Sequence, residues 1–143
     1  MSDAKSAFAA ALTAEHAAIY GYGVVGGHLD NAGKETVRKA DVAHRARRDA
    51  LVVRLASLAA SPPPAPAAYS LPFAVTNRAS ALKLAVALEE ATAEAWRLAL
   101  GVTAGDERRI ALDALVDCAV RATAWRKAAK ISPVTVTYPG VRT

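Results

Sequence analysis

Carboxylates interrupt otherwise apolar helix faces at four places along the chain. Apolar residues recur at spacings of three and four, the pattern of a helix face that packs into a core. An acid stands near the middle of each of the four stripes: Glu15, Asp41, Glu89 and Asp113. Burying an unpaired carboxylate is costly. Four acids that converge in one core therefore need a bound cation, buried Arg and His partners, or a water-filled pocket.

Four helical segments must position these acids, at about 2–28, 34–60, 76–100 and 107–130. Gly26-Gly27 ends the first segment, and the turn 30–33 leads into the second. The Pro-rich stretch 61–76 excludes helix, and 16 steps of polyproline II span roughly 50 Å. A 25-residue helix is only about 38 Å long, so this stretch can return along a whole bundle. The sequence thus predicts two antiparallel hairpins joined by a long crossover.

The composition agrees with an all-α domain. Alanine, the best helix former, supplies 36 of the 143 residues. At this length one domain is expected, and we assign residues 1–130 to a four-helix bundle with its crossover linker at 61–76. Residues 131–143 are expected to form an extended tail, either an edge strand or an arm on a neighbouring chain.

The two hairpins look like copies of each other. An offset of 74 aligns Glu15 with Glu89 and Tyr22 with Trp96. Beyond the turn, an offset of 72 aligns Asp41 with Asp113. We therefore expect an internal repeat, with the acids at equivalent positions of its two halves.

The pattern of acids resembles the ferritin-like superfamily. In that family one acid from each of two helices, and an acid-x-x-His turn from each of the other two, hold a pair of metal ions. Segments 14–22 (AEHAAIYGY) and 69–73 (YSLPF) look most like the branch called domain of unknown function 4439. The resemblance covers residues 1 to about 130 and implies a ferritin-like four-helix bundle.

The resemblance also implies a ligand set and a cofactor. The candidate metal ligands are Glu15, Asp41, His44, Glu89 and Asp113, with Glu90 and Asp117 as further candidates. Iron or manganese is the implied cofactor. The chain departs from the family where Val116 stands in place of the second His, and where Asp41 and Asp113 are a methylene shorter than Glu. Arg48, one turn beyond His44, is a candidate charge partner that could place a guanidinium where a cation would lie.

Three functions remain open. The departures favour a non-catalytic bundle with a degenerate di-metal carboxylate site, which holds a small ligand or a metal. The first alternative is a di-iron or di-manganese carboxylate oxidoreductase, or an iron-binding protein, so the residues leave open whether the chain is an enzyme. The second alternative is a basic interaction module, because the net charge is +5.

The remaining expectations concern partners and location. Charges break the apolar runs every few residues, so we expect no membrane span. The basic residues are spread along helix faces without a recognition motif, and we do not expect nucleic acid as a partner. Ala-rich faces allow close helix approach, and we expect a homodimer. A lone cysteine and the absence of a signal-peptide layout at the N-terminus predict a cytoplasmic protein.

Overall fold

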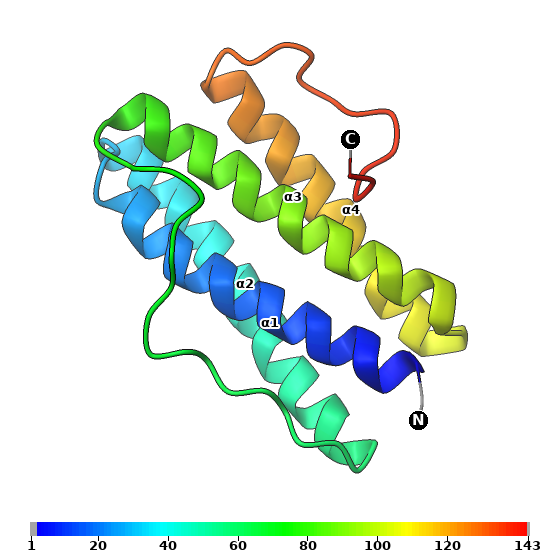
Figure 1. Ribbon diagram of the computed structural model, residues 1–143. Coiled ribbons are helices and arrows are strands. Elements are labelled where there is room, and N and C mark those ends of the chain that lie inside the picture. The colour runs from blue at the N-terminus through cyan, green and yellow to red at the C-terminus, as the bar shows by residue number, and fades with distance from the viewer. Residues whose placement is uncertain (1–2, 143) are drawn as a thin grey trace.

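The computed structural model describes residues 3–142, which form four helices and the loops between them (Figure 1). The helices are α1 (Asp3–Gly26), α2 (Asn31–Ser57), α3 (Arg78–Val102) and α4 (Gly105–Ala128). The described part of the chain contains no strand. The expected all-α class is confirmed, whereas the edge strand considered for the C-terminal tail is wrong.

Side-chain caps decide where two of the helices begin. Asp30 accepts a hydrogen bond from the Gly33 backbone N–H at 2.8 Å, so α2 begins at Asn31 and takes up residues expected to form a turn. At α3, Asn77 accepts from the Ser80 N–H, and the Ser80 hydroxyl accepts from the Asn77 N–H. This reciprocal capping box sets the end of the crossover.

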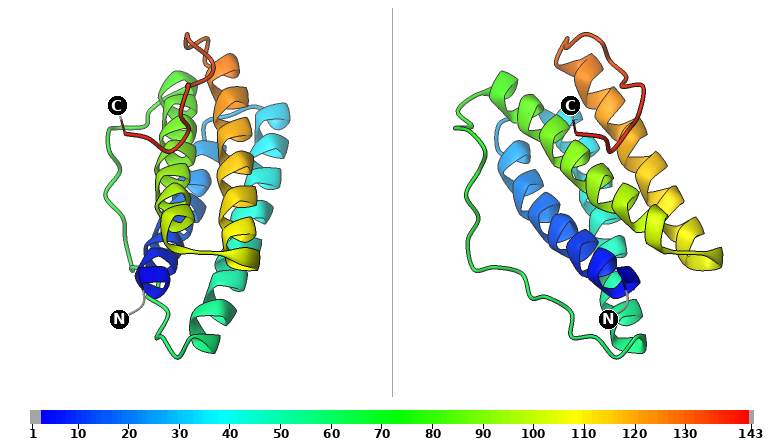
Figure 2. Two further views of the ribbon diagram at one scale, coloured as in Figure 1. Left: turned by 90° about the vertical axis from the view of Figure 1, so that its right-hand side faces the viewer. Right: turned by 45° about the vertical axis from the view of Figure 1, so that its right-hand side comes forward.

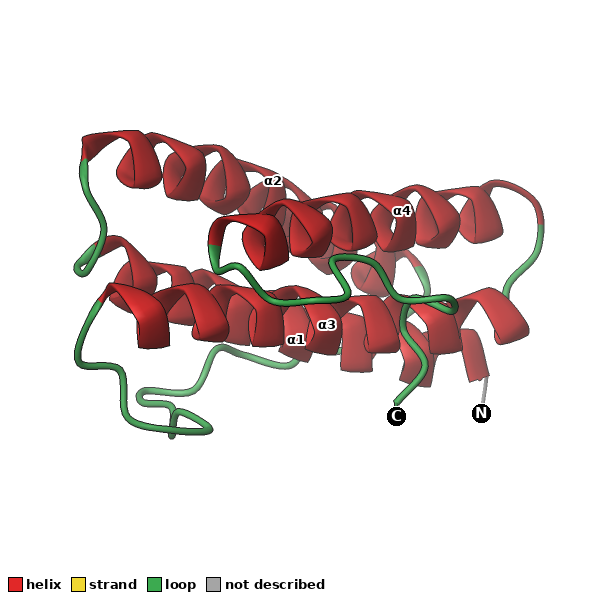
Figure 3. Ribbon diagram, turned by 90° about the horizontal axis from the view of Figure 1, so that it is seen from above, coloured by secondary structure: helices red, strands yellow, loops and turns green. Residues whose placement is uncertain are grey.

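The helices pack as two antiparallel hairpins. Close backbone contacts join α1 with α2, α1 with α3, and α3 with α4. Seen from above, α1 and α3 lie in one layer and α2 and α4 in the other (Figure 3). Segment 58–77 runs outside the bundle, from the end of α2 back to the end at which α2 began (Figure 1). The crossover contacts α1 on the way, where His16 Nε2 lies 3.2 Å from the Pro63 carbonyl oxygen.

Two apolar clusters fill the bundle, one toward each end. Phe8, Leu12, Leu55 and Trp96 belong to the first cluster. The second cluster holds Tyr22, Val25, Leu82, Leu84 and Trp125. Each helix contributes to both clusters, so every helix crosses a middle layer between them. The buried acids Glu15 and Glu89 lie in that layer.

The C-terminal segment folds back over its own bundle rather than extending away from it (Figure 2). Arg126 donates to the Val134 carbonyl at 3.4 Å, and the Arg142 guanidinium lies 3.0 Å from the Glu94 carboxylate. Gly140, with φ +80°, lies so close to α3 that a Cβ there would be 2.7 Å from the Ala93 carbonyl oxygen. The segment 131–142 is therefore a strap across α3 and α4.

Among residues 3–142, the structure has no helix long and apolar enough to cross a membrane. The expectation that the chain lacks a membrane-spanning helix is confirmed for this part of the chain.

Candidate functional site

Three ionisable side chains meet in the middle layer of the bundle. His44 of α2 lies between Glu15 of α1 and Glu89 of α3, and all three side chains are fully buried. The His44 Nδ1 is 2.5 Å from the Glu15 Oε2. Its Nε2 is 2.9 and 3.1 Å from the two carboxylate oxygens of Glu89. A single imidazole therefore connects the two acids that the internal repeat places at equivalent positions.

Helix periodicity explains why these three side chains face inward. Glu15 follows the buried Leu12 by three residues and precedes the buried Tyr22 by seven, which keeps it on the same face of α1. His44 stands in the same way four residues after the buried Ala40. The polar residues lie in the core because apolar neighbours on their own helices determine which face is buried.

The imidazole between the two acids is an imidazolium. A neutral ring has one donor and one acceptor nitrogen, whereas both ring nitrogens here meet carboxylate oxygens that can only accept. Burial alone would lower the pKa of His44, but hydrogen bonds to Glu15 and Glu89 and their negative charges raise it to about 9. The ring is therefore charged at neutral pH, and its positive charge compensates the buried carboxylates.

Aromatic donors complete the hydrogen bonding of both acids. The Trp96 indole N–H donates to the Glu15 Oε1 at 2.8 Å, and the Tyr22 hydroxyl donates to the Glu89 Oε1 at 3.0 Å. The Trp125 indole N–H in turn donates to the Tyr22 hydroxyl at 2.8 Å. Burial and the Glu89 charge raise the pKa of Tyr22 well above its usual value, so the phenol stays protonated and remains a donor.

A row of alternating charges leads from this layer toward the surface. Arg121 donates to Glu89 at 3.1 Å and to Asp117 at 2.9 Å, and Arg47 donates to Asp117 at 2.5 Å. Burial alone would raise the pKa of Asp117, but the two guanidinium groups lower it. Burial opposes the charge on Arg121, yet the Glu89 and Asp117 charges raise its pKa. Negative and positive groups alternate along the row, in the order Glu15, His44, Glu89, Arg121, Asp117, Arg47.

Two of the predicted ligands lie outside this layer. Asp41 pairs with Arg45 at 2.8 Å, and Asp113 pairs with Arg109 at 3.0 Å with a side chain that is 64% exposed. The expectation that both aspartates are withdrawn into the core is wrong. The buried face of α4 is one position away from the expected stripe and consists mainly of small residues: Ala111, Ala114, Cys118 and Ala122.

The three further candidates also have partners elsewhere. Glu90 is largely exposed and pairs with Arg126, and Arg48 pairs with Asp49 at 2.9 Å. Arg48 therefore does not lie at the buried acids. Asp117 does reach the site, through Arg121, although as an ion-pair partner on the surface side of Glu89.

The structure gives the internal repeat a single register. The burial patterns of α2 and α4 agree at the same offset of 74 that relates α1 to α3, rather than the expected 72. His44 then corresponds to the buried Cys118, and Arg47 corresponds to Arg121. The asymmetry of the site follows, because only the first hairpin supplies a ring between the two acids.

Sequence reasoning missed the two arginines that matter most. Arg47 follows His44 by three residues, and Arg121 follows Cys118 by three, so each shares a helix face with a buried position. This spacing was a usable signal for Arg47 once His44 was assigned to the core. For Arg121 the signal depended on the register of α4, which the sequence pattern misplaced.

The side chains in the middle layer do not match a di-metal donor set. Such a centre needs four carboxylates and two His, with a lone pair of each ring directed at a metal ion. Here two carboxylates and one His converge, and both nitrogens of the ring act as donors. Among the described residues, no group of three or more His, Cys, Asp and Glu side chains is arranged to hold a metal ion.

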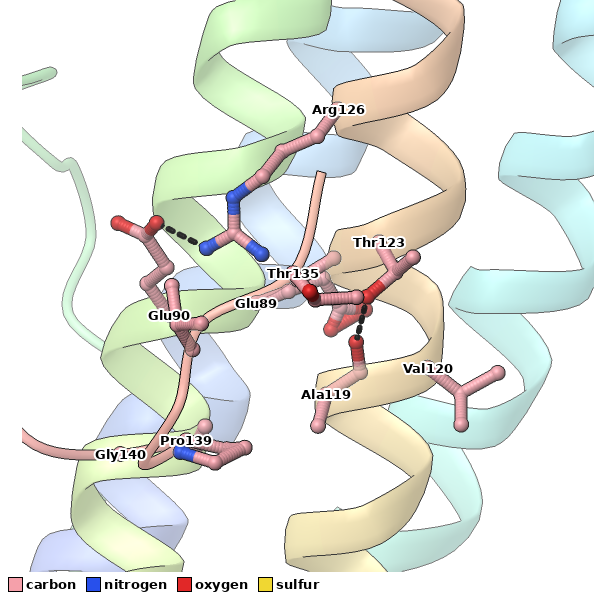
Figure 4. Close-up of a pocket in the computed structure, with 12 residues that line it drawn as sticks. Glu89, Glu90, Ala119, Val120, Thr123, Arg126, Thr135, Pro139 and Gly140 are labelled. Carbon is pink, nitrogen blue, oxygen red and sulfur yellow. Dashed lines mark hydrogen bonds and ion pairs between the residues drawn. The ribbon is translucent and has the colours of Figure 1, made fainter. Parts of the chain in front are cut away.

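A cavity of about 210 Å³ opens beside the middle layer, between α3, α4 and the C-terminal strap (Figure 4). Glu89 and Thr123 line it on the helix side, and Thr135 and Pro139 line it on the strap side. Arg126 lies over this cavity and pairs with Glu90 (Figure 4). The strap thus covers a space that reaches the buried ion pairs.

Fold and site together define an all-α four-helix protein with a buried, ion-paired polar layer. The chain belongs to the family described as "Domain of unknown function (DUF4439)", whose model matches residues 7–143. It is also similar to a solved structure, a conserved hypothetical protein, rv2844, from Mycobacterium tuberculosis. That structure is 38% identical with a TM-score of 0.86, and the match covers 88% of this chain and 96% of the other. A comparison with curated proteins finds no match. The resemblance to domain of unknown function 4439 is confirmed.

Proposed function

We propose that this protein is a non-catalytic, ferritin-like bundle that binds a small molecule and uses an imidazolium where related bundles use metal ions. The observation that carries the proposal is the position of His44, hydrogen-bonded through both ring nitrogens to Glu15 and Glu89. A ring that donates at both nitrogens has no lone pair for a metal. Its positive charge, together with that of Arg121 at Glu89, also provides the compensation that two buried carboxylates require.

The hydrogen bonds within the middle layer support a non-catalytic role. Glu15 accepts from His44 and Trp96, and Glu89 accepts from His44, Tyr22 and Arg121. A general base needs a free acceptor within reach of a substrate proton. These carboxylates already accept from internal donors, so we assign them to holding the helices together.

Metal analysis of the purified protein tests the first part of the proposal. We expect iron and manganese well below one ion per chain, in the wild type and in the His44→Ala and Asp41→Ala variants alike. Stoichiometric iron or manganese that is lost in His44→Ala would contradict the proposal. That outcome would favour the first alternative, a metal-dependent oxidoreductase or an iron-binding protein.

The ion pairs of this chain give little support to a basic interaction module. Arginines along α2 and α4 already pair with acids of the same chain, for example Arg45 with Asp41 and Arg109 with Asp113. Such pairing lowers the positive charge that a phosphate backbone would meet. Binding to DNA that weakens steeply as the salt concentration rises would favour the module instead.

A homodimer remains part of the proposal, now through α4. The strap covers its own bundle, so an arm on a neighbouring chain is not an argument for a dimer. Exposed apolar side chains at a spacing of four run along α4 instead, at Leu112, Val116 and Val120. Light scattering should give twice the chain mass, and a Val116→Lys/Val120→Lys variant should give one chain mass.

We also propose a cytoplasmic protein, in keeping with a free and buried Cys118.

A further inference from the structure

A second cavity lies between α2 and α4 and is also lined by Phe8 of α1 and Trp96 of α3. Its volume is about 250 Å³. Phe8, Leu51 and Trp96 supply apolar walls, and Arg47 and Arg54 of α2 supply polar ones. α2 and α4 are bridged here by ion pairs, since Arg47 pairs with Asp117 and Arg54 with Glu107.

Both arginines also have one guanidinium N–H group that is buried without an acceptor in the described part of the chain. These groups are the Nη1 of Arg47 and the Nε of Arg54. Each arginine uses another nitrogen for its ion pair with α4. The side chains of Arg47 and Arg54 are 20% and 42% exposed. A guanidinium can only donate and stays charged, so a molecule bound beside these two groups should present acceptor atoms, preferably with a negative charge. A carboxylate has this chemistry.

The rest of the wall favours an apolar body. Phe8 and Trp96 are both 1% exposed and pack edge to face, with ring centroids 6.4 Å apart. The cavity is partly open to solvent, and its volume of about 250 Å³ leaves room for an apolar body of the size of benzene. Asp113 also lines the cavity, but its carboxylate is exposed and held by Arg109, so its charge is compensated outside.

We propose that this cavity binds a small organic acid, with its carboxylate at Arg47 and Arg54 and its apolar body against Phe8 and Trp96. The inference rests on the proposed function, because it names the class of small molecule that the bundle binds. Binding would add an anion at the outer end of the charge row, where Arg47 already shares its charge with Asp117.

Two pairs of probes test the role of the carboxylate. Benzoate and octanoate are titrated into the protein by calorimetry, against benzyl alcohol and 1-octanol as neutral molecules with the same apolar bodies. The Trp96 indole N–H signal, followed by nuclear magnetic resonance, reports whether the cavity is the binding site. We expect at least one acid to bind and shift this signal, and the matching alcohol to bind about ten-fold more weakly or less.

Variants on α2 test the residues. Arg54→Gln should weaken acid binding by about ten-fold, because one charged donor is removed. Arg45→Gln, on the same helix but paired with Asp41 outside the cavity, is the matched control and should leave affinity unchanged. Ala50 lies on the exposed side of the wall, so Ala50→Phe fills the cavity without a change in the core and should abolish binding.

Each contrary outcome has a distinct meaning. Alcohols that bind as tightly as acids, or acids that bind Arg54→Gln or Ala50→Phe as well as the wild type, would overturn the assignment of this cavity. Failure of both acids to bind would overturn it as well, while the metal analysis would still test the proposed role of the core on its own. Stoichiometric metal at the middle layer would overturn the proposed function whichever probe binds.

Discussion

The Nδ1 of His44 lies 2.5 Å from the Oε2 of Glu15, and both side chains are fully buried. Burying a lone charge in a helical bundle is strongly unfavourable, and removal of one partner from a buried pair leaves the other uncompensated. The pair is tolerated because the second ring nitrogen of His44 donates to Glu89, and the second carboxylate oxygen of Glu15 accepts from the Trp96 indole. The ionisation of the middle layer is therefore a property of the whole network, and it is open to measurement.

The protonation state of His44 is the first prediction. Its pKa is raised to about 9, so the ring should carry both protons at pH 7.5. Nuclear magnetic resonance of the ring nitrogens should show an imidazolium, assigned by its loss in a His44→Gln variant. A ring that is neutral at pH 7.5 would contradict the network described above.

The pH dependence of stability follows from the same shift. In the unfolded chain the histidine pKa is about 6.5. Its contribution to stability is fully present below that pH and is lost as the pH rises through about 9. Within this window the free energy of unfolding should fall by about 1.4 kcal/mol per pH unit from this group alone. Urea unfolding at several pH values, with the difference between wild type and His44→Gln, measures it; parallel curves for the two proteins would argue against the prediction.

The charge of Glu89 should matter far more than that of its neighbour. Glu89→Gln keeps the shape of the side chain but leaves His44 and Arg121 with a missing counter-charge, and should cost about 3 kcal/mol of stability. Glu90→Gln is the comparison, since Glu90 is 54% exposed and its partner Arg126, although only 6% exposed, also donates to the Val134 carbonyl, so the loss should be smaller. Chemical unfolding compares the two variants, and equal losses would refute the distinction.

Trp96 and Tyr22, which are equivalent in the internal repeat, each donate a hydrogen bond to one of the two buried acids, and their loss should lower stability by different amounts. Trp96→Phe removes one donor to Glu15 and should cost about 1–3 kcal/mol. Tyr22→Phe removes a donor to Glu89 and also the acceptor of the Trp125 indole, so it should cost more than Trp96→Phe does through hydrogen bonding. Unfolding in urea ranks the variants, with a double variant to test whether the two halves act independently.

The C-terminal strap should depend on Gly140. A Cβ at this position would lie 2.7 Å from the Ala93 carbonyl oxygen and 2.8 Å from the Arg97 Cβ, at a φ of +80°. Gly140→Ala should release the strap and speed its cleavage by proteases, with the helices intact by circular dichroism. Gly23→Ala is the control, because nothing within 4 Å would meet its Cβ. Equal cleavage of Gly140→Ala and wild type would show that the strap tolerates the side chain.

Much of the fold follows from local signals. The proline-rich segment, the stop signal at Gly26-Gly27, and the apolar spacing of α1 and α3 predict four helices and a long crossover, because each acts within a few residues of its own position. Glu15, His44 and Glu89 were also correctly placed inside. Each of them has larger buried apolar side chains at helical spacing on the same face.

The face of α4 could not be predicted in the same way. Its buried positions are occupied by Ala111, Ala114 and Ala122, whereas the larger Val116 and Val120 are exposed. Alanine fits an exposed helix face as well as a closely packed one, so hydrophobic spacing alone assigned the wrong stripe and placed Asp113 inside.

The sequence by itself determined the four helices, the crossover, and the burial of Glu15 on α1 and Glu89 on α3, since periodicity is a local property of the chain. Only the tertiary structure decided which charges compensate them. Arg121 is 32 residues from Glu89, and Arg47 is 70 residues from Asp117. Such partners are chosen by how four helices rotate about their axes when they pack, and that rotation depends on all the contacts between them at once.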